Sequence, residues 1–299
     1  MNKPKVSVLM PVYNASVFLD EAINSILFQS FSDFEFIIID DGSIDSSSKI
    51  IENYANSDSR IKFISRENKG ISATRNELIA IAKGDNIAWM DADDISCVNR
   101  IEEQLIYLNH NPDCIVVGCL TELIDTDGDK ICQWNVPLSS NEIDAWHIKG
   151  TGGAIVFPSS MMNKKAVCKV GGFNENLTGA EDLCLLLKLA EIGEIVNLNK
   201  SLYFYRQHIN SISHSAKVKI QHDTQYVMDE ARKRRRMPAY QLTNNKKNVN
   251  HHDIYIKWGW WALREKNISI ANKYARKSIL SNPFGAEGWK LLACCIRGY

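Results

Sequence analysis

The stretch VSVLMPVYNASVFLDEAINSILFQSFSDFEFIIIDDGS, residues 6–43, encloses a helix-length segment between two short apolar runs. The runs at 6–12 and 34–40 are apolar at nearly every position, which indicates strands buried on both faces. Strands of this kind, separated by helical segments, are typical of βαβ units in a parallel sheet. The alternation continues with helical patterns at 47–55 and 71–82 and strand-like runs at 61–65 and 87–90. We therefore expect an α/β fold with a doubly wound, mostly parallel sheet.

The composition is that of an ordinary globular protein. The chain has 299 residues, of which 45% are hydrophobic and 23% charged, enough for one large core or for a domain with an appendage. No apolar window reaches the length of a membrane-spanning helix, and the first residues lack the small-residue cleavage site of a signal peptide. The eight cysteines form no CxxC pair and no Cys/His metal spacing. We expect free thiols and a cytoplasmic location.

Charge is distributed unevenly along the chain, although the net charge is zero. Residues 1–214 contain 18 Lys and Arg against 29 Asp and Glu, whereas residues 215–299 contain 17 against 6. This change predicts a domain boundary near residue 214, followed by a basic, helical C-terminal region. Within that region, the spacing of small residues from Tyr255 to Pro283 matches one tetratricopeptide unit and predicts a helical hairpin.

The basic run RKRRR at 232–236 has three interpretations: nucleic-acid binding, contact with an anionic membrane, or a solvated helix face. We expect no nucleic-acid partner, because the run has no interleaved aromatic residues and belongs to no known module. Contact of residues 215–299 with anionic lipid, peripherally at the inner face of the cell membrane, is the better functional interpretation. A solvated face explains the run equally well.

Three carboxylates follow the strand-like run at 87–90, namely Asp91, Asp93 and Asp94 in the sequence MDADD. Like charges this close raise one another's pKa values, so the arrangement is unfavourable unless a cation lies between them. Hard oxygen ligands favour Mg²⁺ or Mn²⁺, and these ions commonly bridge one or two carboxylates to substrate phosphates. An acid-rich helix start is the alternative, but it accounts for one acid and not for three. The sequence therefore predicts a metal-bound diphosphate.

Two further strand ends carry polar motifs. The first run leads through Pro11 into Tyr13, and the second ends in Asp40 and Asp41. In doubly wound sheets, ligands bind at the carboxyl ends of the strands. One of these two acids could accept a hydrogen bond from a uracil imide or a ribose hydroxyl, and Tyr13 could stack on a base. Strand termination followed by an ordinary turn explains the same residues equally well.

Several other kinds of site are disfavoured. No GxGxxG or GxxxxGK[ST] pattern is present, which argues against a dinucleotide oxidoreductase or a P-loop NTPase. A phosphatase with a DxDxT motif is disfavoured because Ile95 stands where Thr is needed. The segment DTDGDK at 125–130 resembles a calcium loop, but its Gly is misplaced. A hairpin turn at Asp127 and Gly128 is the preferred interpretation.

Six segments occur in an order and spacing that characterise one enzyme family. They are SVLMPVYN (7–14), IIIDDGSIDSS (37–47), NKGISATRN (68–76), MDADD (90–94), GGFNENLTGAEDLCLLLKL (171–189) and YRQHINSIS (205–213). Together they resemble the motifs of inverting family-2 glycosyltransferases of the GT-A fold, of the bacterial surface-polysaccharide type. Each segment is degenerate by itself, but six in order are specific. The resemblance implies a GT-A domain over residues 1–214 with a helical C-terminal extension.

The resemblance also implies roles for particular residues at the donor site. The residues placed at the nucleotide-sugar are Pro11, Tyr13, Asn14, Asp40, Asp41, Arg75, Asn76, Asp91 and Arg206. Asp91 and Asp93 match the DxD motif, and Asp94 is the alternative to Asp93 at the metal. His208 matches a position beside the metal and the diphosphate. The implied cofactor is Mn²⁺ or Mg²⁺.

The segment AED resembles the acidic pair that carries the catalytic base of this family. Its Asp182 corresponds to the base, which leaves Glu181 to orient the acceptor or a neighbouring side chain. The segments FPSSMM (157–162) and EDLCLLLKL (181–189) depart from the family pattern at positions that face the acceptor. The identity of the acceptor is therefore left open.

Taken together, the motifs predict metal-dependent, inverting transfer of a sugar. The expected donor is a nucleoside-diphosphate sugar, with a UDP-sugar preferred, and the expected acceptor is a hydroxyl of a saccharide or lipid-linked saccharide. The alternative is a non-catalytic scaffold that binds nucleotide or carbohydrate in a polysaccharide assembly complex. Intact acids at every motif argue against the scaffold, because a scaffold needs no catalytic base.

Overall fold

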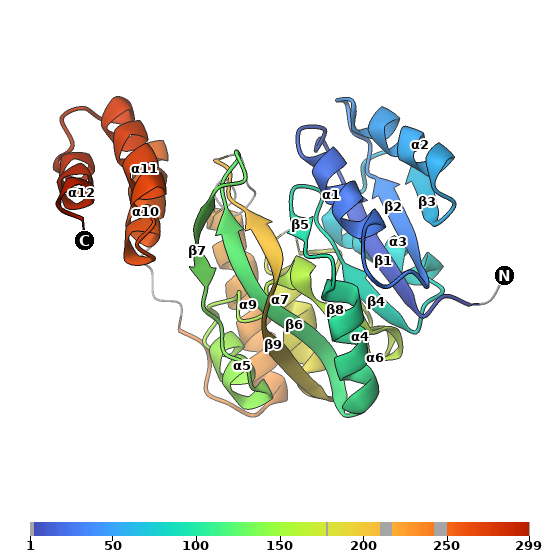
Figure 1. The fold of residues 1–299 in the computed structure, drawn as a ribbon. Helices are drawn as coiled ribbons and strands as arrows, with labels where there is room; N and C mark the ends of the chain where they lie inside the picture. Colours follow the sequence, from blue (N-terminus) through green and yellow to red (C-terminus); the bar gives the residue numbers. More distant parts are fainter. Residues whose placement is uncertain (1–2, 178, 210–216, 242–249, 299) are drawn as a thin grey trace. The chain divides into compact units, whose positions relative to one another are not determined.

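The computed structural model describes residues 3–177, 179–209, 217–241 and 250–298 (Figure 1). Contacts divide the chain into two compact units. The first comprises Met1–Leu120, Val136–Tyr203 and Lys219–Gln241, and the second comprises Thr121–Asn135, Phe204–Val218 and Leu242–Tyr299. Strands β6 (Cys114–Ile124) and β9 (Glu194–Arg206) pass from the first unit into the second. The units are therefore not separated by a single cut along the chain.

The first unit begins with four parallel strands, which lie side by side in Figure 1. They are β1 (Val6–Val12), β2 (Phe34–Asp40), β3 (Ile61–Ser65) and β4 (Asn86–Trp89), in the spatial order β3-β2-β1-β4. The connecting helices are α1 (Leu19–Leu27), α2 (Ser47–Ser57) and α3 (Ile71–Ile81). Val12 is paired with Asp40, and Asp40 with Ser65, so three carboxyl ends meet at one edge. The predicted βαβ alternation is confirmed.

The sheet continues beyond β4 with shorter and antiparallel pairings. Strand β8 (Met161–Asn163) pairs antiparallel with both β4 and β6. The described strands follow the order β3-β2-β1-β4-β8-β6-β9-β5, with β5 at Ile95–Ser96 and β7 (Lys130–Trp134) paired to β6. The remaining helices of this part are α4 (Arg100–His110), α5 (Ser140–His147), η1 (Phe157–Ser159), α6 (Lys164–Lys169) and α7 (Glu181–Leu189).

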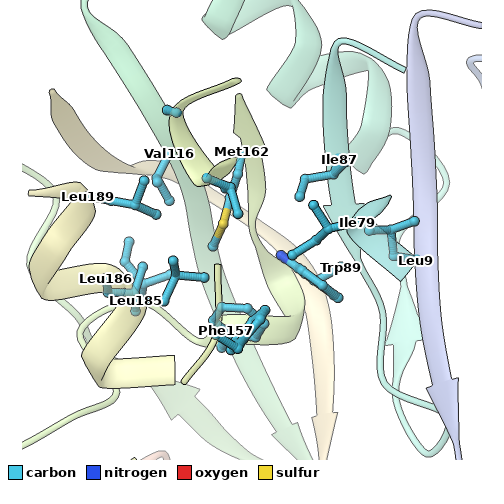
Figure 2. Close-up of a cluster of buried hydrophobic side chains, with 14 of the residues drawn as sticks. Leu9, Ile79, Ile87, Trp89, Val116, Phe157, Met162, Leu185, Leu186 and Leu189 are labelled. Atoms are coloured by element: carbon cyan, nitrogen blue, oxygen red, sulfur yellow. The ribbon is translucent and has the colours of Figure 1, made fainter. Parts of the chain in front are cut away.

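A large apolar core joins the two halves of this sheet (Figure 2). Leu9 and Trp89 come from the parallel strands, Met162 from β8, and Leu185 and Leu189 from α7. The ring centroids of Trp89 and Phe157 lie 5.3 Å apart. Parallel strands that lie between helices are covered on both faces. This burial is why these runs are apolar at nearly every position. The core anchors the end of β4 and the start of α7, which carry the predicted acids.

Helix α9 (Lys217–Arg234) belongs mainly to the first unit. Its buried residues pack in a cluster with residues of and before α7, formed by Leu177, Leu183, Leu187, Val227, Met228 and Ala231. Arg235, directly after the helix, forms an ion pair of 2.8 Å with Asp144. The charge balance predicts a boundary near residue 214, whereas the apolar face of α9 places this basic segment with the first unit.

The second unit combines the β6–β7 hairpin with the C-terminal helices. These helices are α10 (His251–Arg264), α11 (Ile268–Ser281) and α12 (Ala286–Arg297), so the predicted helical hairpin at 255–283 is present. Ile131 of β7 packs in one buried cluster with Trp258 and Tyr274. The hairpin predicted around Asp127 and Gly128 is confirmed, and Gly128 has a φ of 83° there. Among the helices of the described residues, none has the length and apolar character needed to cross a membrane.

Candidate functional site

The three acids of MDADD lie in a turn directly after β4. Asp91 and Asp93 are half-buried and Asp94 is buried. Each offers a carboxylate oxygen, and these oxygens all lie within 4.8 Å of one another. A group of hard oxygen donors with this spacing fits Mg²⁺ or Mn²⁺. The structure thus brings the three predicted carboxylates together at the carboxyl end of a central strand.

Arg75, from α3, links this acidic turn to the start of α7. Its Nη1 donates a hydrogen bond of 2.9 Å to Glu181 Oε1, and its Nη2 lies 3.9 Å from Asp91 Oδ1. Three aromatic rings surround the guanidinium, with centroids 4.7, 5.4 and 6.0 Å from its Cζ, and they belong to Phe157, Phe173 and Trp89. The side chain is only 9% exposed. Aromatic faces favour a planar cation in such surroundings, so Arg75 is held between two carboxylates.

Two carboxylates of this site, Asp91 and Glu181, have raised pKa values. Burial raises the pKa of Asp91 to about 6, and the charges of Asp93, Asp182 and Glu181 add to the increase while Arg75 opposes it. Burial and the neighbouring Asp182 also raise the pKa of Glu181, again against the effect of Arg75. Acids from the β4 turn and from α7 therefore share one electrostatic environment. Clusters of this kind are common at functional sites.

Helix α7 presents its two acids from a rigid support. Ala180, which precedes the helix, has a φ of 64°, a left-handed conformation that is unfavourable for a residue with a Cβ. Strain of this kind commonly accompanies functional sites. The backbone N–H of Leu183 donates a 2.7 Å hydrogen bond to Asp182 Oδ1. Glu181 is paired with Arg75, so the two acids already differ in what they contact.

The acids predicted at the nucleoside are buried and engaged with the chain. Asp41 forms an ion pair with Arg66 and accepts hydrogen bonds from the backbone N–H groups of Lys69 (2.8 Å) and Gly70 (3.0 Å). Asp40 accepts from the Ser65 hydroxyl at 3.3 Å. Both carboxylates therefore order the loops that follow β2 and β3. A role in nucleoside binding stays a prediction for them.

The end of β1 is tied to the end of β2. Asn14 has a φ of 51°, and its Oδ1 accepts a 2.9 Å hydrogen bond from the backbone N–H of Ile44. Its own N–H donates to Ser43 Oγ at 2.9 Å. Pro11 is buried within β1, whereas Tyr13 is 54% exposed. The exposed phenol ring is the member of this group that a base could stack on.

The remaining predicted donor-site residues are Asn76, Arg206 and His208. The Asn76 side chain makes two hydrogen bonds with the backbone of Phe173, in the segment before α7. Its Nδ2 donates to Phe173 O at 3.0 Å, and its Oδ1 accepts from the Phe173 N–H at 2.9 Å. Arg206 and His208 belong to the second unit. There Arg206 is buried and its Nη1 donates to Asp125 O at 3.1 Å. The roles of these three residues stay predictions.

A second group of acids occurs in the β6–β7 loop, which the sequence singles out as DTDGDK. Asp125, Asp127 and Asp129 also offer oxygens within 4.8 Å of one another. Lys273 Nζ lies 2.5, 2.7 and 2.8 Å from these three carboxylates in turn. Tyr274 donates a further 2.8 Å hydrogen bond to Asp125. An ammonium group of the chain thus offsets part of the negative charge of this cluster and attaches α11 to the hairpin.

His147 was not singled out by the sequence, because one histidine in an amphipathic helix gives no distinctive pattern. It is fully buried in α5, and neither ring nitrogen has a hydrogen-bond partner in the part of the chain that the structure describes. Burial lowers its pKa to about 4, although the charges of Asp182 and Asp144 act to raise it. The imidazole is therefore neutral at pH 7 and lies within electrostatic reach of the predicted base.

We expect His147 to make the protein sensitive to acid. In the unfolded chain its pKa is about 6.5, so the unfolded state binds more protons between pH 6.5 and 4, and stability is lost as the pH falls through that range. The free energy of unfolding should fall by on the order of 3 kcal/mol more in the wild type than in His147→Leu between pH 7 and pH 4. Urea unfolding of both proteins at the two pH values measures this difference. Parallel losses in the two proteins would contradict the assignment.

Comparison with known proteins places the chain in a family. Residues 7–171 match the model of glycosyl transferase family 2. A chondroitin synthase of Escherichia coli is 31% identical over 201 residues, which are 67% of this chain and 28% of that protein. The chain thus spans less than a third of the length of that relative.

Two solved structures share the fold. Staphylococcus aureus TarS 1–349, crystallised with UDP-GlcNAc, has a TM-score of 0.61 at 20% identity, and the match covers 98% of this chain and 81% of that one. The mannosyltransferase PcManGT of Pyrobaculum calidifontis, in complex with GDP-Man and Mn²⁺, has a TM-score of 0.58 at 15% identity, covering 100% and 88%. These likenesses confirm the GT-A fold class. Because the family model spans more than half of the chain, the protein belongs to glycosyl transferase family 2.

Proposed function

We propose that the protein transfers a sugar from a nucleoside-diphosphate donor, a UDP-sugar by preference, to a hydroxyl acceptor with inversion. The observation that carries this proposal is the joining of the acidic turn to the start of α7 by Arg75. It brings metal-type oxygen donors and a candidate base into one electrostatic environment. The ligands bound to the two structural neighbours, UDP-GlcNAc in one and GDP-Man with Mn²⁺ in the other, support a nucleotide-sugar donor.

Asp91, Asp93 and Asp94 are the residues that would hold Mn²⁺ or Mg²⁺. A cation bound there would offset the negative charge of the departing diphosphate. Arg75 contributes positive charge beside the same turn. The chain itself therefore supplies part of the charge stabilisation at this site.

The acceptor side of the proposal rests on Asp182. Inversion requires a carboxylate that accepts the proton of the attacking hydroxyl on the side of the sugar opposite the leaving group. Asp182 lies in the first turn of α7 and accepts a hydrogen bond from the Leu183 N–H, whereas Glu181 is hydrogen-bonded to Arg75. We assign Asp182 as the base and Glu181 as the residue that positions Arg75. The proposed acceptor is a saccharide or lipid-linked saccharide of a surface polysaccharide.

A donor screen tests the proposal. The full chain is incubated with a panel of UDP- and GDP-sugars and Mn²⁺, and release of UDP or GDP is measured. We expect release from a UDP-sugar that stops in excess chelator and falls in Asp93→Asn but not in the surface control Asp113→Asn. Full release in excess chelator would contradict metal dependence. Nucleotide binding without any turnover, across donors and acceptors, would instead favour a non-catalytic scaffold.

We also propose peripheral contact with anionic lipid through the basic C-terminal region. The available charge is smaller than the sequence indicates, because Arg234 and Arg235 form ion pairs with Glu191 and Asp144 at 3.0 and 2.8 Å. Cosedimentation of the full chain with phosphatidylserine vesicles tests the contact. Binding should weaken with salt. A protein that stays in the supernatant at low salt would rule the contact out.

A further inference from the structure

The hydroxyl group of Tyr203 joins the first and last acids of the turn after β4. Its Oη donates a 2.8 Å hydrogen bond to Asp94 Oδ2 and accepts a 3.4 Å hydrogen bond from the backbone N–H of Asp91. Tyr203 lies on β9, 109 residues from Asp94 in the chain, and is fully buried. The Tyr203 hydroxyl therefore contacts both the carboxylate of Asp94 and the backbone of Asp91.

The ring of Tyr203 is itself fixed by a buried cation. The Cζ atom of Arg100 lies 5.2 Å from the ring centroid. Arg100 is fully buried, and its Nη1 and Nε donate to Trp89 O at 3.1 Å and Ser96 Oγ at 2.7 Å. No carboxylate forms an ion pair with it among the described residues, and its Nη2 has no hydrogen-bond partner. A buried charge with mostly neutral partners is unfavourable, which indicates that it serves something beyond packing.

We propose that Tyr203 is a positioning residue of the metal site: it holds the Asp94 carboxylate and the Asp91 backbone so that the three acids converge before a cation binds. The proposal rests on the metal-dependent function proposed above. Arg100 acts through Tyr203 by keeping the ring in place. Both residues lie outside the family motifs from which the site was predicted.

The role proposed for Tyr203 is to preorganise the acidic turn before a cation binds. Groups that hydrogen-bond to metal ligands fix their orientation, and losing such a group typically costs about 10- to 100-fold in metal affinity. Three carboxylates repel one another, so without a fixed partner the turn would relax away from convergence. Tyr203 opposes that relaxation at both ends of the turn. Phenylalanine would fill the same volume without either hydrogen bond.

The test is Tyr203→Phe in the full chain, with Mn²⁺ as the probe. Binding is followed by the loss of the free Mn²⁺ signal in electron paramagnetic resonance, without donor or acceptor. We expect the Kd for Mn²⁺ to rise about tenfold or more in Tyr203→Phe. Tyr107→Phe removes a phenol hydroxyl from the half-buried Tyr107 of α4 and should leave the Kd unchanged. Nucleotide release by Tyr203→Phe should recover toward the wild-type rate as Mn²⁺ approaches saturation, which a general loss of structure would not allow.

Three outcomes would overturn the inference, and they are distinguishable. If the wild type binds Mn²⁺ and Tyr203→Phe binds it equally well, the positioning role is wrong while the proposed function stands. If the wild type itself does not bind Mn²⁺, the metal-dependent function fails and the positioning role with it. A raised Kd in the Tyr107→Phe control as well would show that the effect is not specific to Tyr203, and would also overturn the inference.

Discussion

Replacing Asp182 by Asn is expected to lower the rate of sugar transfer by about 10² to 10⁴ while leaving donor affinity nearly unchanged. The amide keeps the volume of the side chain but cannot accept the proton of the attacking hydroxyl. Asp182 is suited to this task because its carboxylate is half-buried, oriented by the Leu183 N–H and carried by a helix anchored in the core. The neighbouring Glu181 is already paired with Arg75 at 2.9 Å.

The measurement is steady-state transfer together with UDP affinity in the presence of Mn²⁺. Asp113→Asn makes the same chemical change at an exposed position and serves as the control. Glu181→Gln should act differently: it loosens Arg75, so the KM for the donor should rise along with a loss of rate. If Asp182→Asn turns over at the wild-type rate while Glu181→Gln is inactive, the base has been assigned to the wrong residue.

Replacing Arg75 by Met should strongly destabilise the first unit. Arg75 and Glu181 are 9% and 13% exposed, so removing the guanidinium leaves a nearly buried carboxylate without its cation. Breaking one partner of a buried pair typically costs about 3–5 kcal/mol. The pKa of Glu181, already raised by burial and by Asp182, should rise further. Transfer should also fail, because the link between the acidic turn and α7 is lost.

A double-mutant cycle separates the contribution of the Arg75–Glu181 ion pair to stability from the contribution of Arg75 packing. In Arg75→Met combined with Glu181→Gln the unpaired charge is absent, so the double variant should be more stable than Arg75→Met alone. Urea unfolding of the four proteins at pH 7 gives the coupling free energy. Additive losses of stability would mean that the aromatic contacts of Arg75, and not its ion pair, explain its burial.

Local patterns of the sequence were sufficient to predict the elements of the parallel sheet. Apolar runs such as VSVLMPV and FEFIIID predict buried parallel strands, because a strand that is apolar at nearly every position must be covered on both faces. The Asp-Gly turn and the helical hairpin near the C-terminus were also predicted from local patterns. The acidic turn could also be predicted from the sequence. Three carboxylates in four positions, Asp91, Asp93 and Asp94, repel one another unless a cation lies between them.

The tertiary structure decided which of these residues meet. Arg75 and Glu181 are 106 residues apart, Tyr203 and Asp94 are 109 apart, and Lys273 and Asp125 are 148 apart. No periodicity encodes such pairs, because they depend on the order of strands in the sheet and on which helix covers which strand. The same holds for His147, whose pKa is lowered mainly by burial. It also holds for α9, whose apolar residues pack in the first unit. The sequence by itself determined the elements and the candidate acids, whereas long-range packing determined which charges are paired and which are buried.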